Sequence, residues 1–480
     1  MDWAGSLTGE QGSLHVEDEQ WTGFKPQWVL SLAVGSAIGW GAFILPYGWI
    51  KSGGLWGSIA GFILGGMMVA VVGLSYGAAV RSMPVSGGSV AYATVGFGKI
   101  PGLIAGWSLA LGYGSIVALN ASAATLVFRQ IFPGVFNTFP LYSIAGWEIY
   151  LPEVALATGF LVGGAYLNSK GATLSGRFQF GCVLVMLGAV CILGFLSLQF
   201  WLANGHLLPE AIPESVSTAG AIGTILAIVP WAYVGFDAIP QLAGEFDFPA
   251  QRARRLLFWG VLGATLFYVA MILTTAFVVG NSVEAYEQSA WPIADAISTT
   301  LGNKGEILLI VAVSAGVLTG LNGFYTATSR VLQAMGRAYF LPRSFARVNP
   351  RNGSPTFAVW TVCALCLITP WFGRASLGWI VEMSSVGVTV SYFFTCMFAL
   401  RVAAHDKSKT GFLNRMPAIL GVAFSIIFLL QLIVPGSPGS LAPQAFFALS
   451  IWVLIACGLC ILRYKAISNA PRNAVLHGEK

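Results

Sequence analysis

The stretch GSAIGWGAFILP, residues 35–46, places three glycines and a proline inside one apolar segment of the chain. In a helix interior, glycine costs about 1 kcal/mol and proline about 3 kcal/mol relative to alanine. We therefore expect the helix that begins near residue 28 to unwind around Gly39–Gly41. Unwinding inside a membrane is tolerated only against protein or a wet cavity. The N–H groups freed at such a break would form a site for an anion.

A second stretch, PWAYVGFDAIP at residues 230–240, has the same ingredients. In both stretches a glycine precedes a proline by five positions: Gly41 and Pro46 in the first, Gly235 and Pro240 in the second. Interrupted apolar segments at corresponding places in two halves of a chain indicate the binding site of an inverted-repeat transporter. The sequence therefore predicts two broken helices that meet at a substrate site.

Asp237 adds a carboxylate to the second stretch. A charged side chain at this depth costs at least about 2.5–3.5 kcal/mol, so it must face protein or water. It is either a functional group or the structural partner of a backbone N–H freed at the break. Glu245, nearer the end of the same segment, is expected to pair with the basic loop at 252–255.

The composition excludes a soluble globular protein. Of the 480 residues, 56% are hydrophobic and 9% are charged, whereas soluble domains carry about 25% charged residues. The apolar residues also form long runs, such as residues 55–80 and 256–279. About 20 apolar residues span a bilayer as a helix. The chain is therefore expected to be an all-α membrane protein embedded in the lipid bilayer.

The apolar runs predict about twelve transmembrane helices. They cover residues 28–50, 56–80, 101–128, 149–168, 177–203, 217–245, 256–280, 305–338, 353–373, 376–401, 416–435 and 444–463.

Lysine and arginine residues indicate the orientation. With a cytoplasmic N-terminus, 21 of the 25 lie on the cytoplasmic side and four on the outer side: Lys51, Arg129, Lys304 and Arg374. This bias follows the positive-inside rule, so we expect cytoplasmic N- and C-termini in the cell (inner) membrane. The formal net charge of +6 is then a feature of topology, and no nucleic-acid partner is expected.

Nothing in the sequence indicates an enzyme. Intramembrane catalysis needs clustered nucleophiles, bases or metal ligands, but the four His residues fall outside the predicted spans and no H-E-x-x-H motif occurs. The pairs Cys363/Cys366 and Cys457/Cys460 lie in apolar runs without a His or acidic partner. We expect no catalytic residue, no metal and no cofactor; a redox or zinc site at these cysteines is the alternative.

Four motifs follow one another along the predicted helices. They are GWGAFILP at 39–46, PVSGG at 84–88, WAYVGFD at 231–237 with a later Glu245, and SRVLQAM at 329–335 with Leu341-Pro342. With these motifs the chain resembles the amino acid–polyamine–organocation superfamily of transporters, over most of the first ten helices.

The resemblance implies a LeuT-type fold of two inverted five-helix repeats, with helices 1 and 6 broken. The repeats would cover residues 27–203 and 217–401, followed by two additional helices at 416–463, with cytoplasmic tails at 1–26 and 464–480. It also implies a permease or exchanger that moves an amino acid or related amine by alternating access.

The resemblance further implies a set of site residues. A substrate carboxylate and amino group would rest on Ala37, Ile38, Gly39, Trp40 and Gly41 and on carbonyls near Trp231 and Val234, with Ser115 and Phe324 completing the pocket. Trp231 would act as a gate. Asp237 stands where the arginine–agmatine antiporter has its pH-sensitive acidic residue, which makes it the candidate for gating and proton coupling.

Two departures from the family pattern leave substrate and coupling open. Trp40 stands where the family usually has a small hydroxyl residue, which favours a small substrate or an amine without a carboxylate. Proton-dependent relatives can carry a lysine in helix five, but residues 179–195 contain none, and Met186 lies near the expected point. Sodium coupling through hydroxyls of helix eight (Thr319, Thr326, Thr328 and Ser329), inorganic-ion transport and a non-transporting nutrient sensor are the alternatives. A monomer or a homodimer is expected.

Overall fold

The computed structural model describes residues 23–476, except residues 145, 290, 374, 406–410 and 438. Most of the predicted tail at 1–26 and the last four residues of the predicted tail at 464–480 therefore lie outside the described residues. The longer helices are α2 (Pro26–Ala37), α4 (Pro46–Ser82), α5 (Gly88–Phe97), α6 (Lys99–Ile131), α8 (Leu151–Ser169), α9 (Ala172–Asn204), α10 (Thr218–Ala232), α12 (Ala253–Val279), α13 (Pro292–Arg337), α14 (Thr356–Cys366), α15 (Ala375–His405), α16 (Gly411–Ile433) and α17 (Pro443–Leu462). The short ones are α3 (Gly41–Ile44), α7 (Pro133–Phe136), α11 (Ala238–Gln241) and α18 (Tyr464–Asn469).

Eight of the described helices are long and apolar enough to cross a membrane: α4, α6, α9, α12, α13, α15, α16 and α17. The other four predicted spans coincide with helices that are shorter or broken, namely α2 with α3, α8, α10 with α11, and α14. The protein is therefore a helical multi-pass membrane protein. The count of twelve crossings stays a prediction, because length and composition qualify only eight helices.

Both helix breaks lie where the sequence predicts them. α2 ends at Ala37 and α3 begins at Gly41, while α10 ends at Ala232 and α11 begins at Ala238. A further interruption falls at Gly54, whose φ of +69° divides α4 in two. The residues between α2 and Gly54 thus form the second part of the first predicted span.

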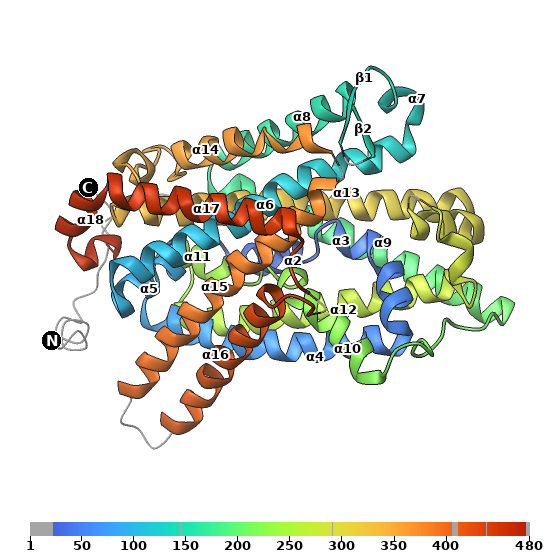
Figure 1. The fold of residues 1–480 in the computed structure, drawn as a ribbon, viewed down its shortest axis with the longest axis horizontal. Helices are drawn as coiled ribbons and strands as arrows, with labels where there is room; N and C mark the ends of the chain where they lie inside the picture. Colours follow the sequence, from blue (N-terminus) through green and yellow to red (C-terminus); the bar gives the residue numbers. More distant parts are fainter. Residues whose placement is uncertain are drawn as a thin grey trace.

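A two-stranded β-hairpin was not expected from the sequence. β1 (Pro140–Ile144) and β2 (Trp147–Tyr150) pair antiparallel, and with α7 they lie at the end of the molecule opposite α18 (Figure 1). We call these the hairpin end and the α18 end. Arg129 of α6 holds the hairpin, because its guanidinium lies 4.5 Å from the ring centre of Trp147 and donates to Glu153.

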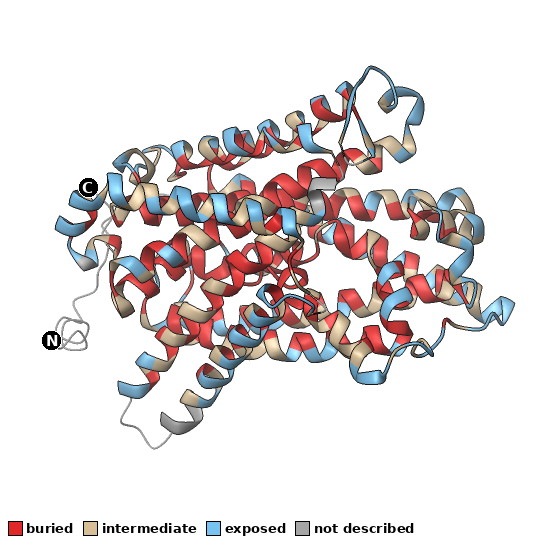
Figure 2. Cartoon of the chain, in the orientation of Figure 1, coloured by how far each residue is buried: buried red, intermediate tan, exposed pale blue. Residues whose placement is uncertain are grey.

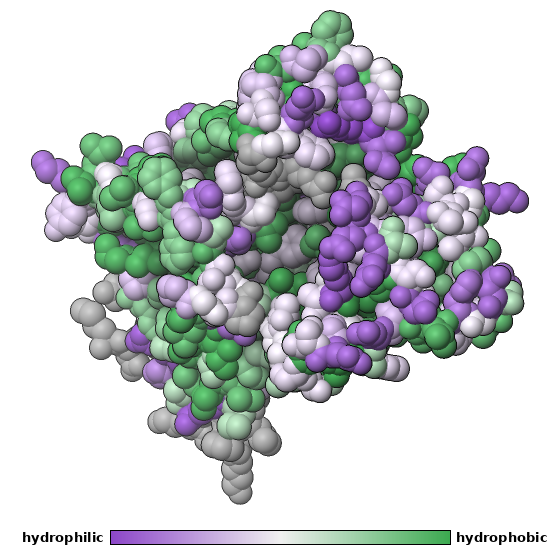
Figure 3. Space-filling model, turned by 45° about the vertical axis from the view of Figure 1, so that its right-hand side comes forward, coloured by the Kyte–Doolittle hydropathy of each residue, from purple (hydrophilic) through white to green (hydrophobic). Residues whose placement is uncertain are grey.

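Apolar side chains cover the outer faces of the helix bundle. Only 6% of the apolar window of α17 is buried inside the protein, and Phe447, Leu454 and Leu462 on this helix are exposed. Buried residues gather in the middle of the bundle (Figure 2). The surface shows broad apolar areas beside hydrophilic clusters (Figure 3). Such apolar faces suit lipid, since lipid tails replace water around them.

An ion pair closes the α18 end of the bundle. Arg330 of α13 donates from Nε and Nη2 to the two carboxylate oxygens of Glu245, at 2.9 Å each. The ring of Phe24 lies over the same guanidinium, and the N–H of Phe24 donates to the carbonyl of Glu245 at 2.8 Å. The expected pairing of Glu245 with the loop at 252–255 is therefore wrong, because the turn after α11 directs this carboxylate toward α13.

This pair predicts an asymmetry between single and double substitutions. Removing one partner of a buried ion pair costs about 3–5 kcal/mol, because the other charge is left unpaired. Glu245→Gln should cost more than Arg330→Met, because it leaves the Arg330 side chain, which is 2% exposed, without its partner, whereas the Glu245 side chain is 25% exposed. Replacing both partners, as in Glu245→Gln with Arg330→Met, should recover part of the loss, since no charge is then left unpaired. Thermal unfolding of the purified variants measures this difference. Equal melting temperatures for the single and double variants would contradict it.

Candidate functional site

A cavity of about 290 Å³, a volume that includes open space at its edge, lies between the two helix breaks. Its lining consists of Ser36, Ala37, Gly39, Trp40, Gly41, Ala42, Ile116, Leu119, Asn120, Trp231, Ala232, Val234, Tyr268 and Phe324. None of these lining residues is charged. An uncharged lining disfavours a ligand with a net charge, so this cavity suits a small, uncharged or zwitterionic molecule.

The first break supplies hydrogen-bond donors to the cavity. Within the part of the chain that the structure describes, no group accepts from the N–H of Gly39, Trp40 or Gly41. A buried backbone N–H without a partner costs free energy comparable to a lost hydrogen bond. Three consecutive unpaired N–H groups therefore favour a ligand with strong acceptors, such as a carboxylate.

Acceptors come from both breaks. The carbonyls of Ser36 and Val234, two lining residues, accept no hydrogen bond from any described group. Carbonyl oxygens carry partial negative charge and can accept from an ammonium group. The cavity thus offers both parts of a zwitterion a complementary set of backbone groups, without using a charged side chain.

Tyr268 and Gly235 hold the two breaks together. The Tyr268 hydroxyl, on α12, lies 2.7 Å from the carbonyl oxygen of Ala37 and 2.6 Å from that of Ala232. Gly235 has a φ of +124°, and a Cβ on it would lie 2.6 Å from the backbone nitrogen of Ala37. Only glycine permits this approach, so the residue at position 235 sets the distance between the breaks.

Aromatic rings form the walls of the cavity. Trp40 and Trp231 meet edge to face, with ring centres 6.3 Å apart. A Cβ built on Gly41 would collide with the Trp231 ring, so this ring lies directly against the first break. Phe324 of α13 forms another wall and packs against Tyr113 at a ring-centre distance of 5.4 Å.

Most of the residues that the sequence singles out come together here. Ala37, Gly39, Trp40, Gly41, Trp231, Val234 and Phe324 all line the cavity. Ile38 and Ser115 do not, and α6 contributes Ile116, Leu119 and Asn120 instead. Consecutive residues of a helix point about 100° apart, so the sequence could locate this part of α6 but not the face that turns inward. Tyr268 also lines the cavity, and no pattern in the sequence indicated it.

Asp237 lies behind the cavity wall, toward the α18 end. Its side chain is fully buried. It accepts hydrogen bonds from the Tyr113 hydroxyl at 2.6 Å and from the N–H of Gly235 at 2.9 Å. Asp237 therefore has a structural partner in the backbone N–H of Gly235. It is also connected to the cavity by contacts, because Tyr113 packs against Phe324, which lines the cavity.

The hydroxyls of α13 considered for sodium are engaged with protein groups. The Thr319 hydroxyl donates to the carbonyl oxygen of Gly35 at 3.0 Å, and the Thr326 hydroxyl donates to the amide oxygen of Asn168 at 2.6 Å. Thr328 and Ser329 donate to carbonyls of their own helix. Met186 stands near the position of the family's lysine on α9. The α9 side chain that donates to α2 is Gln179, whose Nε2 donates to the carbonyl of Ser31 at 3.3 Å.

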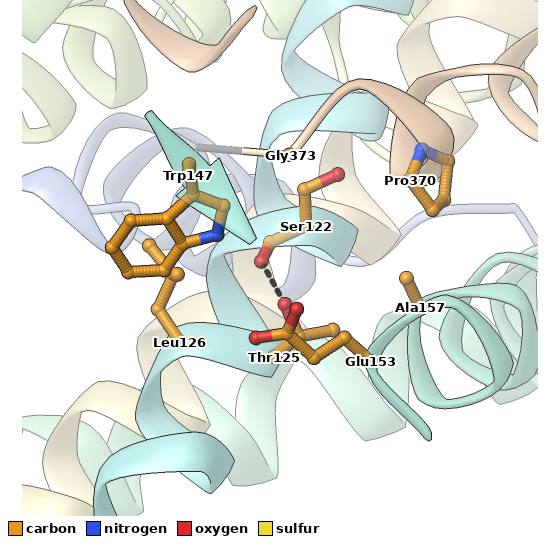
Figure 4. A pocket seen from close by; sticks show the side chains of 8 residues that line it. All are labelled: Ser122, Thr125, Leu126, Trp147, Glu153, Ala157, Pro370 and Gly373. Atoms are coloured by element: carbon orange, nitrogen blue, oxygen red, sulfur yellow. Dashed lines mark hydrogen bonds between the residues drawn. The ribbon is translucent and has the colours of Figure 1, made fainter. Parts of the chain in front are cut away.

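A second cavity lies beneath the hairpin, away from the breaks. It is lined by Ser122, Thr125, Leu126, Trp147, Glu153, Ala157, Pro370 and Gly373 (Figure 4). Its carboxylate already has a partner, because Arg129 donates to Glu153 at 3.1 Å. None of the predicted site residues reaches this cavity. The cavity between the breaks is therefore the candidate functional site.

Comparison with known proteins identifies the family and relatives of this chain. A family profile described as amino acid permease matches residues 26–457. The chain is 25% identical to the branched-chain amino acid permease BcaP of Lactococcus lactis, over 77% of this chain and 79% of the relative. It is 26% identical to the lysine-specific permease LysP of Escherichia coli, over 77% of each chain. It is 25% identical to the serine/threonine exchanger SteT of Bacillus subtilis, over 87% of this chain and 92% of the relative.

Gly41→Val should abolish ligand binding at the cavity while the protein still folds and inserts. The added side chain would displace the Trp231 ring and crowd the unpaired N–H groups, and a β-branched residue restricts the unwound backbone. Gly48→Val is the matched control, because a Cβ on Gly48 meets no atom within 4 Å. A thermal-shift titration with amino acids measures binding. Equal ligand-induced stabilisation of the two variants would show that Gly41 serves only packing.

Proposed function

Because the chain belongs to the amino acid permease family, we propose that it is a secondary active transporter that moves an amino acid or related amine across the cell membrane by alternating access. Family and relatives are transporters, so the protein is not an enzyme. One observation carries the proposal: a single cavity is bordered by unpaired N–H groups of one helix break and unpaired carbonyls of both.

The backbone of the two breaks would hold the substrate head group. The carboxylate accepts from the N–H groups of Gly39, Trp40 and Gly41, and the ammonium group donates to the carbonyls of Ser36 and Val234. Both interactions are charge-assisted and therefore stronger than neutral hydrogen bonds. A head group that every amino acid shares is thus bound without any charged side chain.

Contacts on both sides of the cavity support alternating access. Toward the hairpin end, the Tyr47 hydroxyl donates to the Val283 carbonyl at 2.7 Å and Lys51 pairs with Glu287. Toward the α18 end, the Asp237–Tyr113 bond and then the Glu245–Arg330 pair close the bundle. These contacts join segments next to the breaks to other helices, so movement at the breaks would open one side while the other stays closed.

The proposed transporter has the topology that the sequence predicts. In this proposed topology the chain crosses the membrane twelve times, and the lysine and arginine bias supports a cytoplasmic α18 end and an external hairpin. Residues 27–203 and 217–401 form two inverted repeats, each with a broken first helix, and residues 416–463 add two helices. The corresponding places of the breaks in α2 and α3 and in α10 and α11 support this arrangement.

Proton coupling through Asp237 is preferred to sodium coupling. Asp237 is a fully buried carboxylate next to the second break, and protonation would remove the cost of holding its charge away from water. The α13 hydroxyls donate to protein groups, but donation leaves their oxygen lone pairs able to bind a cation, so the preference rests on Asp237.

Uptake into proteoliposomes tests the proposed function. We expect purified protein to accumulate or exchange a labelled amino acid, and Gly41→Val to abolish this activity while Gly48→Val retains it. A protein that binds amino acids in a thermal-shift assay but moves none across the membrane would be a sensor, and transport would be rejected.

Asp237→Asn tests the coupling separately. If protonation of this carboxylate gates transport, wild-type uptake should rise as the external pH falls, whereas the variant should be insensitive to pH and retain some exchange. Asn keeps the shape of Asp but cannot lose a proton. The measurement is initial uptake across a pH series, with and without sodium. A wild-type rate that does not depend on pH but increases with sodium would reject proton coupling at Asp237 and favour sodium coupling through the α13 hydroxyls.

A further inference from the structure

Three residues that line the cavity each carry a side-chain atom without a hydrogen-bond partner among the described residues: Ser36 Oγ, Trp40 Nε1 and Asn120 Oδ1. All three residues are more than nine-tenths buried. Buried polar atoms are almost always paired, and leaving one unpaired is costly. In a binding cavity, such atoms indicate the hydrogen bonds that a ligand completes.

Asn120 presents an acceptor, and its orientation is fixed. Its Nδ2 donates to the carbonyl of Ile116 at 2.9 Å, which assigns the opposite atom, Oδ1, as the unpaired acceptor. The amide lies between two glycines: a Cβ on Gly39 or Gly320 would come within 3.3 or 2.7 Å of Oδ1. The side chain therefore has little room to turn, and a ligand must bring the donor to it.

Trp40 presents a donor. Its indole Nε1 can only donate, and no described group accepts from it. The neighbouring walls, Ile116, Leu119 and Phe324, are apolar. Asn120 Oδ1 and Trp40 Nε1 thus add one acceptor and one donor to the lining, beside the Ser36 hydroxyl, which can both donate and accept.

A hydroxyl group complements this pair, because it donates once and accepts with its lone pairs. A charged side chain does not, since no charged residue lines the cavity and a buried charge without a partner is strongly disfavoured. We infer that the cavity selects a small neutral amino acid whose side chain carries a hydroxyl, which donates to Asn120 Oδ1 and accepts from Trp40 Nε1. This inference rests on the proposed function and names the substrate class of the same site.

Isosteric pairs of amino acids test the inference in the wild-type protein. Serine and alanine differ in the hydroxyl alone, and threonine and valine have almost the same shape. Competition against uptake of labelled serine should favour serine over alanine, and threonine over valine, by about tenfold or more, as expected when a ligand leaves buried polar atoms unpaired. Equal competition within both pairs would overturn the inference and leave amino acid transport intact.

Two substitutions test whether Asn120 and Trp40 cause the preference for serine over alanine. Asn120→Leu removes the acceptor and Trp40→Phe removes the donor while keeping a ring, so each should reduce the serine-to-alanine ratio toward one. The ratio is the readout, because either variant can also lower the overall rate. Trp56→Phe, at an exposed tryptophan, is the matched control and should keep the wild-type ratio.

The outcomes separate this inference from the proposed function. An unchanged ratio in both Asn120→Leu and Trp40→Phe would overturn the inference even if wild-type protein prefers serine, because the preference would then arise elsewhere. Should one variant fail to fold, the other still decides. If no amino acid is taken up or competes, the proposed function itself fails.

Discussion

A chain inside a bilayer must satisfy its backbone hydrogen bonds within the protein, and the structure depends on how this constraint is met at two broken helices. At the second break Asp237 accepts from the N–H of Gly235, and Tyr268 reaches carbonyls of both breaks. The N–H groups of Gly39, Trp40 and Gly41 remain unpaired. The protein thus satisfies part of the exposed backbone itself and leaves the rest for a ligand.

The helices behind this centre are held by polar contacts that leave little freedom. Asn322 of α13 accepts from Asn168 of α8 at 3.0 Å and from Ser175 of α9 at 2.9 Å, and it donates to Gln179 at 2.8 Å. A fully paired buried network of this kind rigidifies its surroundings. The breaks, by contrast, are joined by the Tyr268 hydroxyl, by close packing at Gly235 and by the Trp231 ring against the first break. We therefore expect motion at the breaks and rigidity in α8, α9 and α13.

Recognition divides between backbone and side chains in the proposed site. Backbone groups suit the head group, which is the same in every amino acid, whereas Trp40 and Asn120 would read the part that differs. The relatives carry names with different substrates, branched-chain amino acids, lysine, and serine or threonine. A shared head-group site with variable side-chain walls accounts for such differences within one family. The side chains of the walls, and not the backbone of the breaks, would then decide which amino acid is selected.

The sequence alone determined the helical membrane fold and the positions of both breaks, because apolar run length and the cost of glycine and proline in a helix are local properties. It also located Asp237 and half of the residues that line the cavity. It did not reveal that Ile116 and Asn120, rather than Ser115, line the cavity, that Glu245 pairs with Arg330, or that Pro140–Ile144 and Trp147–Tyr150 pair as two strands. Each of these depends on the rotation of a helix or the course of a loop relative to distant residues. Only tertiary packing decides such placements, since the partners lie far apart in the chain.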